Sequence, residues 1–276
     1  MYLSKIMLNP RNRNVARDLA DCYQMHRSIM SMFPTMAEPT TSARNDMGVL
    51  FRVEQELRGN SIIFILQSKV EPNVDMLPSG YVNESSGSNS IAPVSIKNID
   101  SFVNHINAGT TYRFRLRANP TWKTGTTSKE ERLSGKQKSN GKRAALSREQ
   151  DRIDWIVRKG LENGFELLSV AFTSPGRRGE DVKTIYNVRT TGLGEVLGRK
   201  PRDRKSVPGS SDETSSNNGN EHQQSKKPGK QLSFYSVVFE GYLRVVDKEK
   251  FRMGFENGIG PAKSFGFGLL SIAPVG

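Results

Sequence analysis

Three side chains that could act together on a phosphate group occur within five residues, in the segment DCYQMHRSIM. Tyr23 and His26 are three residues apart and Tyr23 and Arg27 are four apart, so on a helix they project from neighbouring positions. Histidine suits proton transfer near neutral pH, tyrosine can orient or donate a proton, and arginine can stabilise developing negative charge. The spacing predicts a helix-borne site for acid–base chemistry at a phosphate.

A competing interpretation is that His26 is a buried core residue. Apolar residues form a stripe along the same helix, and at 100° per residue His26 falls inside it; the stripe comprises Val15, Leu19, Cys22, Ile29 and Phe33. Taken alone, the helix favours the core interpretation.

Near the C-terminus, the segment GIGPAKSFGFG places four glycines around Lys263; they are Gly258, Gly260, Gly266 and Gly268. Glycine lets backbone N–H groups approach a ligand closely, and the lysine suggests an anion such as phosphate. The Walker A and dinucleotide fingerprints do not fit, because here a helix precedes the glycines and a strand follows. A tight helix-to-strand turn without a ligand is the alternative. The alternation of Phe265 and Phe267 favours core packing over base stacking.

Composition narrows the class of protein. The 276 residues are 35% hydrophobic, which suits two modest domains, and no apolar run approaches the roughly 20 residues of a membrane span. The single cysteine, Cys22, excludes internal disulfides, as expected for a cytoplasmic protein. The three histidines have no ligand-like spacing, so we expect no metal and no cofactor.

Positive charge is concentrated in one block of the chain. Residues 1–110 contain ten Lys or Arg and ten Asp or Glu, whereas residues 111–159 contain fourteen and five. Such a block indicates a polyanion partner, most simply nucleic acid. A solvated basic face or a disordered basic loop is the alternative.

The order of elements predicts an α+β fold of two tandem ferredoxin-like (RRM-like) domains, residues 1–109 and 110–276. Each half reads β-α-β-β-(α)-β, with one helix expected over about 14–33 and a poorly marked second helix in the first half. In the segment TYRFRLRA, Arg113, Arg115 and Arg117 alternate with apolar residues, which predicts a strand with the arginines on one face. A polar, serine-rich tract at about 199–231 is expected to be a mobile insertion.

Several segments together closely resemble the CasE family, the CRISPR repeat-processing endoribonucleases of type I-E (Cascade) systems. They are MYLSKI, DCYQMHRSIMSMFP, YRFRLRANPTW and above all FEGYLRVVDKEKFRMGFENGIGPAKSFGFGLLSIAP. The tracts at 71–95 and about 199–231 contribute nothing to the resemblance.

The resemblance implies metal-independent cleavage of CRISPR repeat stem-loops in precursor RNA, by attack of a ribose 2′-OH that leaves a 2′,3′-cyclic phosphate. It makes His26 catalytic with Tyr23 assisting, the basic hairpin SPGRRGEDVKTIYNVR an RNA contact, and other Cascade subunits partners. Family members vary at the position of Arg27. The predicted RNA-binding residues are Arg27, Arg113, Arg115, Arg117, Lys123, Arg177, Arg178, Lys183, Arg189 and Lys263.

Two rival functions differ in what they require. A non-catalytic RNA-binding subunit of the same superfamily needs the fold, the basic block and the glycine-rich loop, but no helix-borne histidine. A nucleotide-dependent enzyme needs a phosphate loop of known pattern, and both tested patterns fail.

Overall fold

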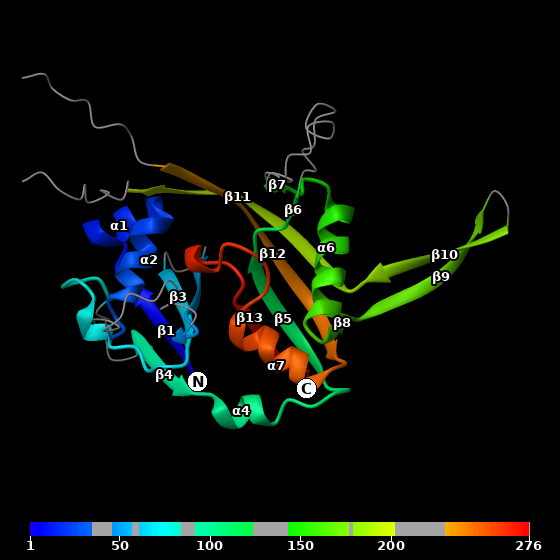
Figure 1. Cartoon of the computed structure of the whole chain (residues 1–276), viewed down its shortest axis with the longest axis horizontal. Coiled ribbons are helices and arrows are strands. Elements are labelled where there is room, and N and C mark those ends of the chain that lie inside the picture. Colours follow the sequence, from blue (N-terminus) through cyan, green and yellow to red (C-terminus); the bar gives the residue numbers. More distant parts are fainter. Residues whose placement is uncertain are drawn as a thin grey trace, which may run out of the picture.

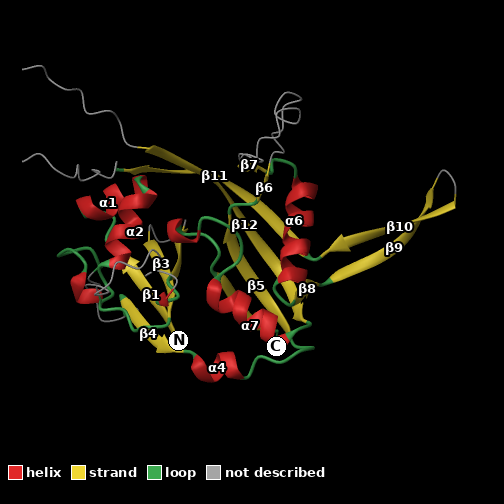
Figure 2. Cartoon of the chain, in the orientation of Figure 1, coloured by secondary structure: helices red, strands yellow, loops and turns green. Residues whose placement is uncertain are grey.

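The computed structural model describes residues 1–34, 46–56, 61–83, 92–123, 143–176, 179–201 and 230–275. Two antiparallel sheets, each with helices on it, lie next to each other (Figures 1 and 2). Each has the strand order of a ferredoxin-like fold, which confirms the predicted fold class.

The first sheet has the order β2-β3-β1-β4. Apolar residues of β1 alternate, and Ile6 and Leu8 form one core with Val15 of α1 and with Met25 and Ile29 of α2. Within the described residues between β3 and β4, the expected second helix is represented by the short 3-10 helix η1. The elements are β1 (Tyr2–Leu8), α1 (Arg13–Ala20), α2 (Cys22–Met30), β2 (Leu50–Glu56), β3 (Ser61–Ser68), η1 (Val74–Met76) and β4 (Val94–Asn98).

The single helix expected over 14–33 is wrong, because Asp21 divides it into α1 and α2. Asp21 has extended backbone angles (φ −137°, ψ 103°), and its side chain accepts hydrogen bonds from the backbone N–H groups of Tyr23 and Gln24. This is an N-cap, which satisfies donors that a helix start leaves open. α2 therefore has its own direction, separate from that of α1.

The second sheet repeats the order as β11-β12-β5-β13, with β8 also paired to β12. α6 and α7 contribute Trp155, Ile156, Phe251 and Phe255 to its core. The elements are β5 (Thr111–Ala118), α6 (Glu149–Glu162), β8 (Phe165–Leu167), β11 (Val188–Lys200), β12 (Lys230–Val245), α7 (Lys248–Asn257), η2 (Lys263–Phe265) and β13 (Leu270–Pro274).

Between the two sheets in the chain lies α4 (Asp100–Asn104). Val103 and Ile106 belong to the core of the second sheet, so this connection packs with the second domain. The boundary at 109 and 110 stays a prediction.

Two smaller strand pairs are inserted in the second domain. β9 (Ser169–Gly176) and β10 (Gly179–Tyr186) form a hairpin between β8 and β11, and it projects away from the rest of the molecule (Figure 1). β6 (Thr121–Lys123) pairs with β7 (Arg143–Ala145).

β11 and β12 continue past the end of β5, whose pairing with β12 stops at Ala118 and Val237. We call this extension the arm: residues 194–200 paired with residues 230–236. It reaches over α1 and α2 (Figure 1). The insertion expected at 199–231 is therefore wrong at its ends, because Arg199 and Lys200 pair with Gln231 and Lys230. Residues 202–229 lie outside the described part.

Candidate active site and nucleic-acid interface

The apolar face of α2 packs on the first sheet, and the face that carries Tyr23 and His26 turns toward the second domain. Cys22, Met25 and Ile29 are buried, His26 and Tyr23 are half-buried, and Arg27 is exposed. His26 thus lies at the margin of the apolar stripe and not in the core, contrary to the interpretation that the helix alone favours. A half-buried imidazole can reach a substrate and still be held by protein contacts.

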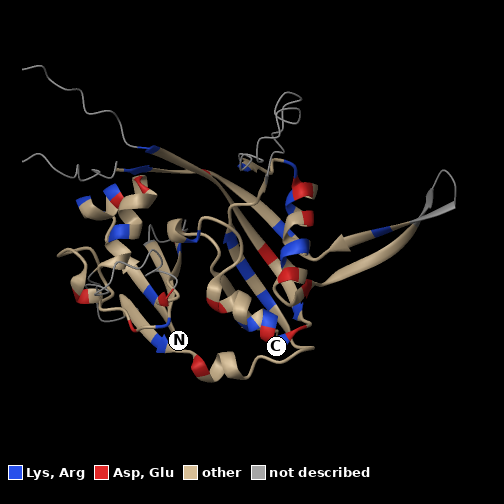
Figure 3. Cartoon of the chain, in the orientation of Figure 1, with Lys and Arg blue, Asp and Glu red and all other residues tan. Residues whose placement is uncertain are grey.

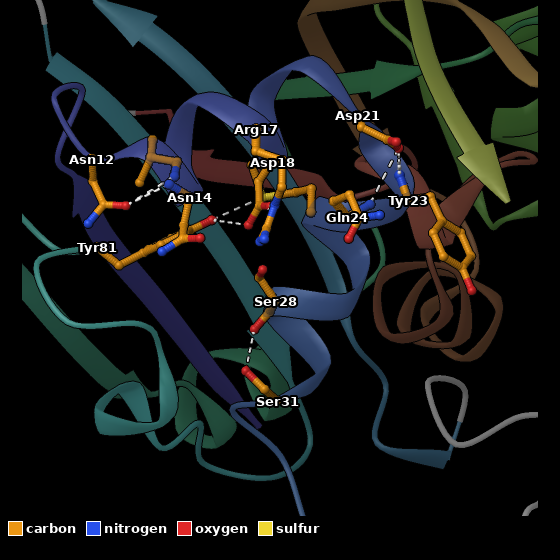
Figure 4. A network of polar contacts seen from close by, with 12 residues as sticks. Asn12, Asn14, Arg17, Asp18, Asp21, Tyr23, Gln24, Ser28, Ser31 and Tyr81 are labelled. Atoms are coloured by element: carbon orange, nitrogen blue, oxygen red, sulfur yellow. Dashed lines mark hydrogen bonds and ion pairs between the residues drawn. The ribbon is translucent and has the colours of Figure 1, made fainter. Parts of the chain in front are cut away.

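A buried polar network fixes α1 to the sheet behind α2 (Figure 4). The Tyr81 hydroxyl donates to Asp18 Oδ2 at 2.9 Å, and Arg17 Nε donates to Asp18 Oδ1 at 2.9 Å. Burial, and then the charge of Asp18, raise the pKa of Tyr81 well above its usual value. In Figure 4 the Tyr23 ring points away from this network, so it can contact groups on the opposite side of α2.

All four glycines of the predicted loop have positive φ, from 78° at Gly258 to 89° at Gly268. A Cβ at Gly258 would lie 2.7 Å from Leu50 Cδ2, and one at Gly266 would lie 3.0 Å from Phe51 Cε2. Both contacts are with β2 of the first domain. Glycine is thus required because the loop backbone passes close to the facing domain.

The glycine-rich loop brings η2 against α2. The rings of His26 and Phe265 meet edge to face, with centroids 6.2 Å apart and planes inclined by 66°. Lys263 begins the same short helix. The structure therefore brings together the helix with Tyr23 and His26 and the loop with Lys263. Phe267 is buried as expected, whereas Phe265 is half-buried and faces the histidine.

The two domains are joined by a buried arginine that sequence reasoning missed. Arg52 of β2 donates through Nε to Glu54 at 2.6 Å, and through Nη1 to the carbonyls of Leu269 (3.3 Å) and Arg115 (3.4 Å). Its Nη2 donates to Ser271 Oγ at 3.1 Å. Burial lowers the pKa of Arg52, and the Glu54 carboxylate opposes that shift. Along β2 the apolar Phe51 and Val53 alternate with the charged Arg52 and Glu54, a pattern that predicts an exposed arginine and gives no signal of its burial.

Two of the three arginines on β5 face this junction. Arg115 Nη1 donates to Glu240 at 2.9 Å, and Arg117 Nε donates to Ser236 Oγ at 2.8 Å. The Arg117 guanidinium carbon lies 5.3 Å from the Phe267 ring centroid, and burial lowers the pKa of Arg117 to about 10. Both side chains thus have protein partners, and the RNA contacts predicted for them stay untested.

The third arginine, Arg113, is exposed at the base of the β9–β10 hairpin. It lines a concave region of about 750 Å³ together with Arg189, Tyr186 and Tyr242. Lys183 lies further along the hairpin, on β10 opposite Phe172 of β9. Figure 3 shows basic residues on α1, α2, α6 and the arm, so the described positive charge is spread over several elements.

The other predicted RNA contacts are less defined. Lys123 is the last residue of β6 and pairs with Arg143, but its side chain is not described. Arg177 and Arg178, which lie between β9 and β10 in the sequence, are outside the described residues. Arg27 is exposed on α2 next to the histidine.

The fold and site define an α+β protein of two tandem ferredoxin-like domains, with a helix-borne histidine held against a glycine-rich loop of the other domain. The sequence model of the CRISPR associated protein family matches residues 1–274, and the chain belongs to that family. This confirms the resemblance inferred from the sequence.

Similar proteins extend along the whole chain. CRISPR-associated endoribonuclease Cse3 of Thermus thermophilus is 29% identical over 274 residues, covering 99% of this chain and 100% of the relative. CRISPR system Cascade subunit CasE of Escherichia coli K12 is 29% identical over 275 residues, covering 100% of both. The structure of Thermus thermophilus Cse3 bound to an RNA representing a pre-cleavage complex is 26% identical, with a TM-score of 0.61, covering 99% and 98%. Within the described residues, no helix is long and apolar enough to cross a membrane.

Proposed function

We propose that this chain is an endoribonuclease of CRISPR RNA maturation that cuts the repeat stem-loops of precursor transcripts and stays bound to the product as a Cascade subunit. The observation that carries the proposal is the contact between α2, with Tyr23 and His26, and the glycine-rich loop with Lys263. Two relatives along the full chain are named as an endoribonuclease and as a Cascade subunit. A cytoplasmic location, expected from the single cysteine, is part of the proposal.

The proposed reaction is an internal transesterification. The 2′-oxygen of the nucleotide before the scissile bond loses its proton and forms a bond to phosphorus. The bond from phosphorus to the 5′-oxygen of the next nucleotide breaks, and that oxygen takes up a proton. The products are a 2′,3′-cyclic phosphate and a 5′-hydroxyl. The equation balances without another reactant. We expect no metal to be needed, because His26 can transfer a proton and Lys263 can stabilise the phosphate charge.

The residues at the α2–η2 contact match the needs of this reaction. His26 transfers one of the two protons, and Tyr23 on the same face of α2 orients the sugar or assists the transfer. Lys263 stabilises the charge of the phosphate, and Arg27, exposed one position after the histidine, is a second cation in reach of the RNA backbone.

The RNA stem is proposed to extend toward the β9–β10 hairpin. Arg113 and Arg189 at its base, and Lys183 on β10, offer cations on an open surface. Phosphate contacts and shape suffice for an A-form stem, whose deep major groove side chains read poorly. Arg177 and Arg178 belong to the same proposal on sequence grounds.

The decisive experiment compares His26→Ala with His105→Ala, a matched control because His105 is exposed at the C-terminal end of α4. We expect His26→Ala to stay folded and to bind repeat RNA normally, yet to cut it about 10²- to 10⁴-fold more slowly in single-turnover assays. His105→Ala should cut at the normal rate. Cutting should continue in excess EDTA, and a single 2′-deoxy substitution before the scissile phosphate should stop it.

Normal cutting by His26→Ala would refute the proposed role of the histidine. Cleavage of the 2′-deoxy substrate would refute the transesterification. If the wild-type protein binds repeat RNA and cuts nothing, the non-catalytic RNA-binding alternative replaces the proposal.

A further inference from the structure

Four aromatic rings from three distant parts of the sequence form a row that ends at the histidine. His26 of α2 meets Phe265 of η2 at a centroid distance of 6.2 Å. Phe265 stacks on Phe234 of β12 at 4.9 Å with an angle of 22°, and Phe234 meets Phe267 at 6.0 Å and 60°. Each distance is in the range of favourable ring contacts.

The far end of this row is held rigidly. Phe267 is fully buried, and the Arg117 guanidinium lies over its ring at 5.3 Å. Arg117 also donates to Ser236, two residues from Phe234 on the same strand. Phe234 and Phe267 are therefore fixed to the second sheet, and Phe265 stacks on a firm support.

The arm that carries Phe234 is also attached to the start of α2. The backbone N–H of Arg199 donates to Asp21 Oδ1 at 3.2 Å, next to the bonds by which Asp21 caps α2. Gly198 lies so close that a Cβ there would be 2.6 Å from Cys22 Sγ. The arm thus contacts the first turn of α2 directly, and it is linked to His26 indirectly, because Phe234 of the arm stacks on Phe265 of η2.

We infer that Phe265, supported by Phe234 of the arm, is a positioning residue that holds the His26 imidazole in its working orientation. The inference depends on the proposed catalytic role of His26. A proton-transfer group must lie within hydrogen-bond reach of its target, and small displacements of such a group are costly in rate. The edge-to-face contact restricts rotation of the half-buried imidazole about its side-chain bonds.

The direct test is Phe265→Leu, which keeps apolar volume and removes the ring. We expect single-turnover cutting to fall about 10- to 100-fold, in line with the cost of misplacing a catalytic group. The Kd for a 2′-deoxy repeat RNA should change less than about twofold. Phe265→Tyr, which keeps the ring, should cut at the wild-type rate, and Phe234→Leu should show a smaller loss of rate than Phe265→Leu.

The control variant is Phe102→Leu. Phe102 is also half-buried and meets Tyr112 edge to face at 6.2 Å, far from α2 in the sequence. The melting temperature of this variant measures the general cost of losing such a ring.

A double-mutant cycle separates positioning from direct RNA contact. If Phe265 acts through His26, Phe265→Leu should cause no further loss of rate in a His26→Ala background. The same fold-loss in both backgrounds, or RNA binding weakened more than about fivefold, would show that the ring contacts RNA and would overturn the inference. A wild-type rate for Phe265→Leu alongside a slow His26→Ala would overturn the inference alone. A wild-type rate for His26→Ala would instead reject the proposed function.

Discussion

The domain junction and the base of the β9–β10 hairpin share one strand, β5, yet use its arginines differently. At the junction, Arg115 and Arg117 are engaged by Glu240 and Ser236, and Arg117 is desolvated enough to lower its pKa to about 10. At the hairpin base, Arg113 is exposed beside a broad concavity. Three arginines on one face of one strand therefore differ in their surroundings: two contact other protein side chains and one is exposed to solvent.

This difference separates two kinds of basic residue. A desolvated arginine with fixed partners holds protein segments together, because breaking its contacts leaves a buried charge uncompensated. An exposed arginine contributes little to folding and is free to exchange solvent for a phosphate. Desolvated and exposed arginines contribute equally to the net charge of +13, so this value overstates the positive charge that RNA can contact.

The largest effect should come from Arg52, at the centre of the junction. Arg52→Ala leaves Glu54 without its closest cation and removes the bonds to Leu269 and Ser271. We expect the free energy of unfolding to fall by about 3 kcal/mol, measured by urea denaturation. The matched control, Arg113→Ala, should stay within about 0.5 kcal/mol of the wild type. If both variants are equally stable, the arginine at the junction does not stabilise the fold more than the exposed arginine at the hairpin base.

A smaller effect should separate Arg113 from Arg117 in RNA binding. Arg113→Ala should weaken binding of the repeat stem-loop several-fold and reduce the slope of log K against log salt by about 1, as expected when one phosphate contact is lost. Arg117→Ala should lower the melting temperature and leave that slope unchanged. A salt titration of both variants provides the measurement. A reduced slope for Arg117→Ala would place that arginine on the RNA.

The smallest effect concerns the thiol beneath the arm. Burial, and then the charge of Asp21, raise the pKa of Cys22 to about 11. The raised pKa favours the neutral thiol, so alkylation at pH 8 should be slow and should accelerate with a midpoint near 11, not near 9. Labelling followed by mass spectrometry against pH measures this. Phe234→Leu should speed labelling by loosening the arm, whereas rapid labelling of the wild type at pH 8 would mean that the arm does not cover the thiol.

Local patterns predicted much of the framework. The alternation in TYRFRLRA identified β5 and its arginine face, and the glycines around Lys263 indicated positive φ, which all four have. The break at Asp21 was missed although its signal was present: Asp followed three residues later by Gln is typical of a helix N-terminus. The arm was missed because its two strands, residues 194–200 and 230–236, pair across a long serine-rich tract that separates them in the sequence.

The sequence by itself determined the residues that can do chemistry, the face of each strand and the conformations of the glycine-rich loop, because these depend on side-chain type and short-range periodicity. It also supported the membership of the chain in its family. Only the tertiary structure decided that His26 is half-buried against Phe265, that Arg115 and Arg117 serve the junction, and that the arm reaches α2. Those outcomes depend on contacts between residues up to about 240 positions apart, such as His26 and Phe265, and such contacts are set by the packing of the two domains and not by any local pattern.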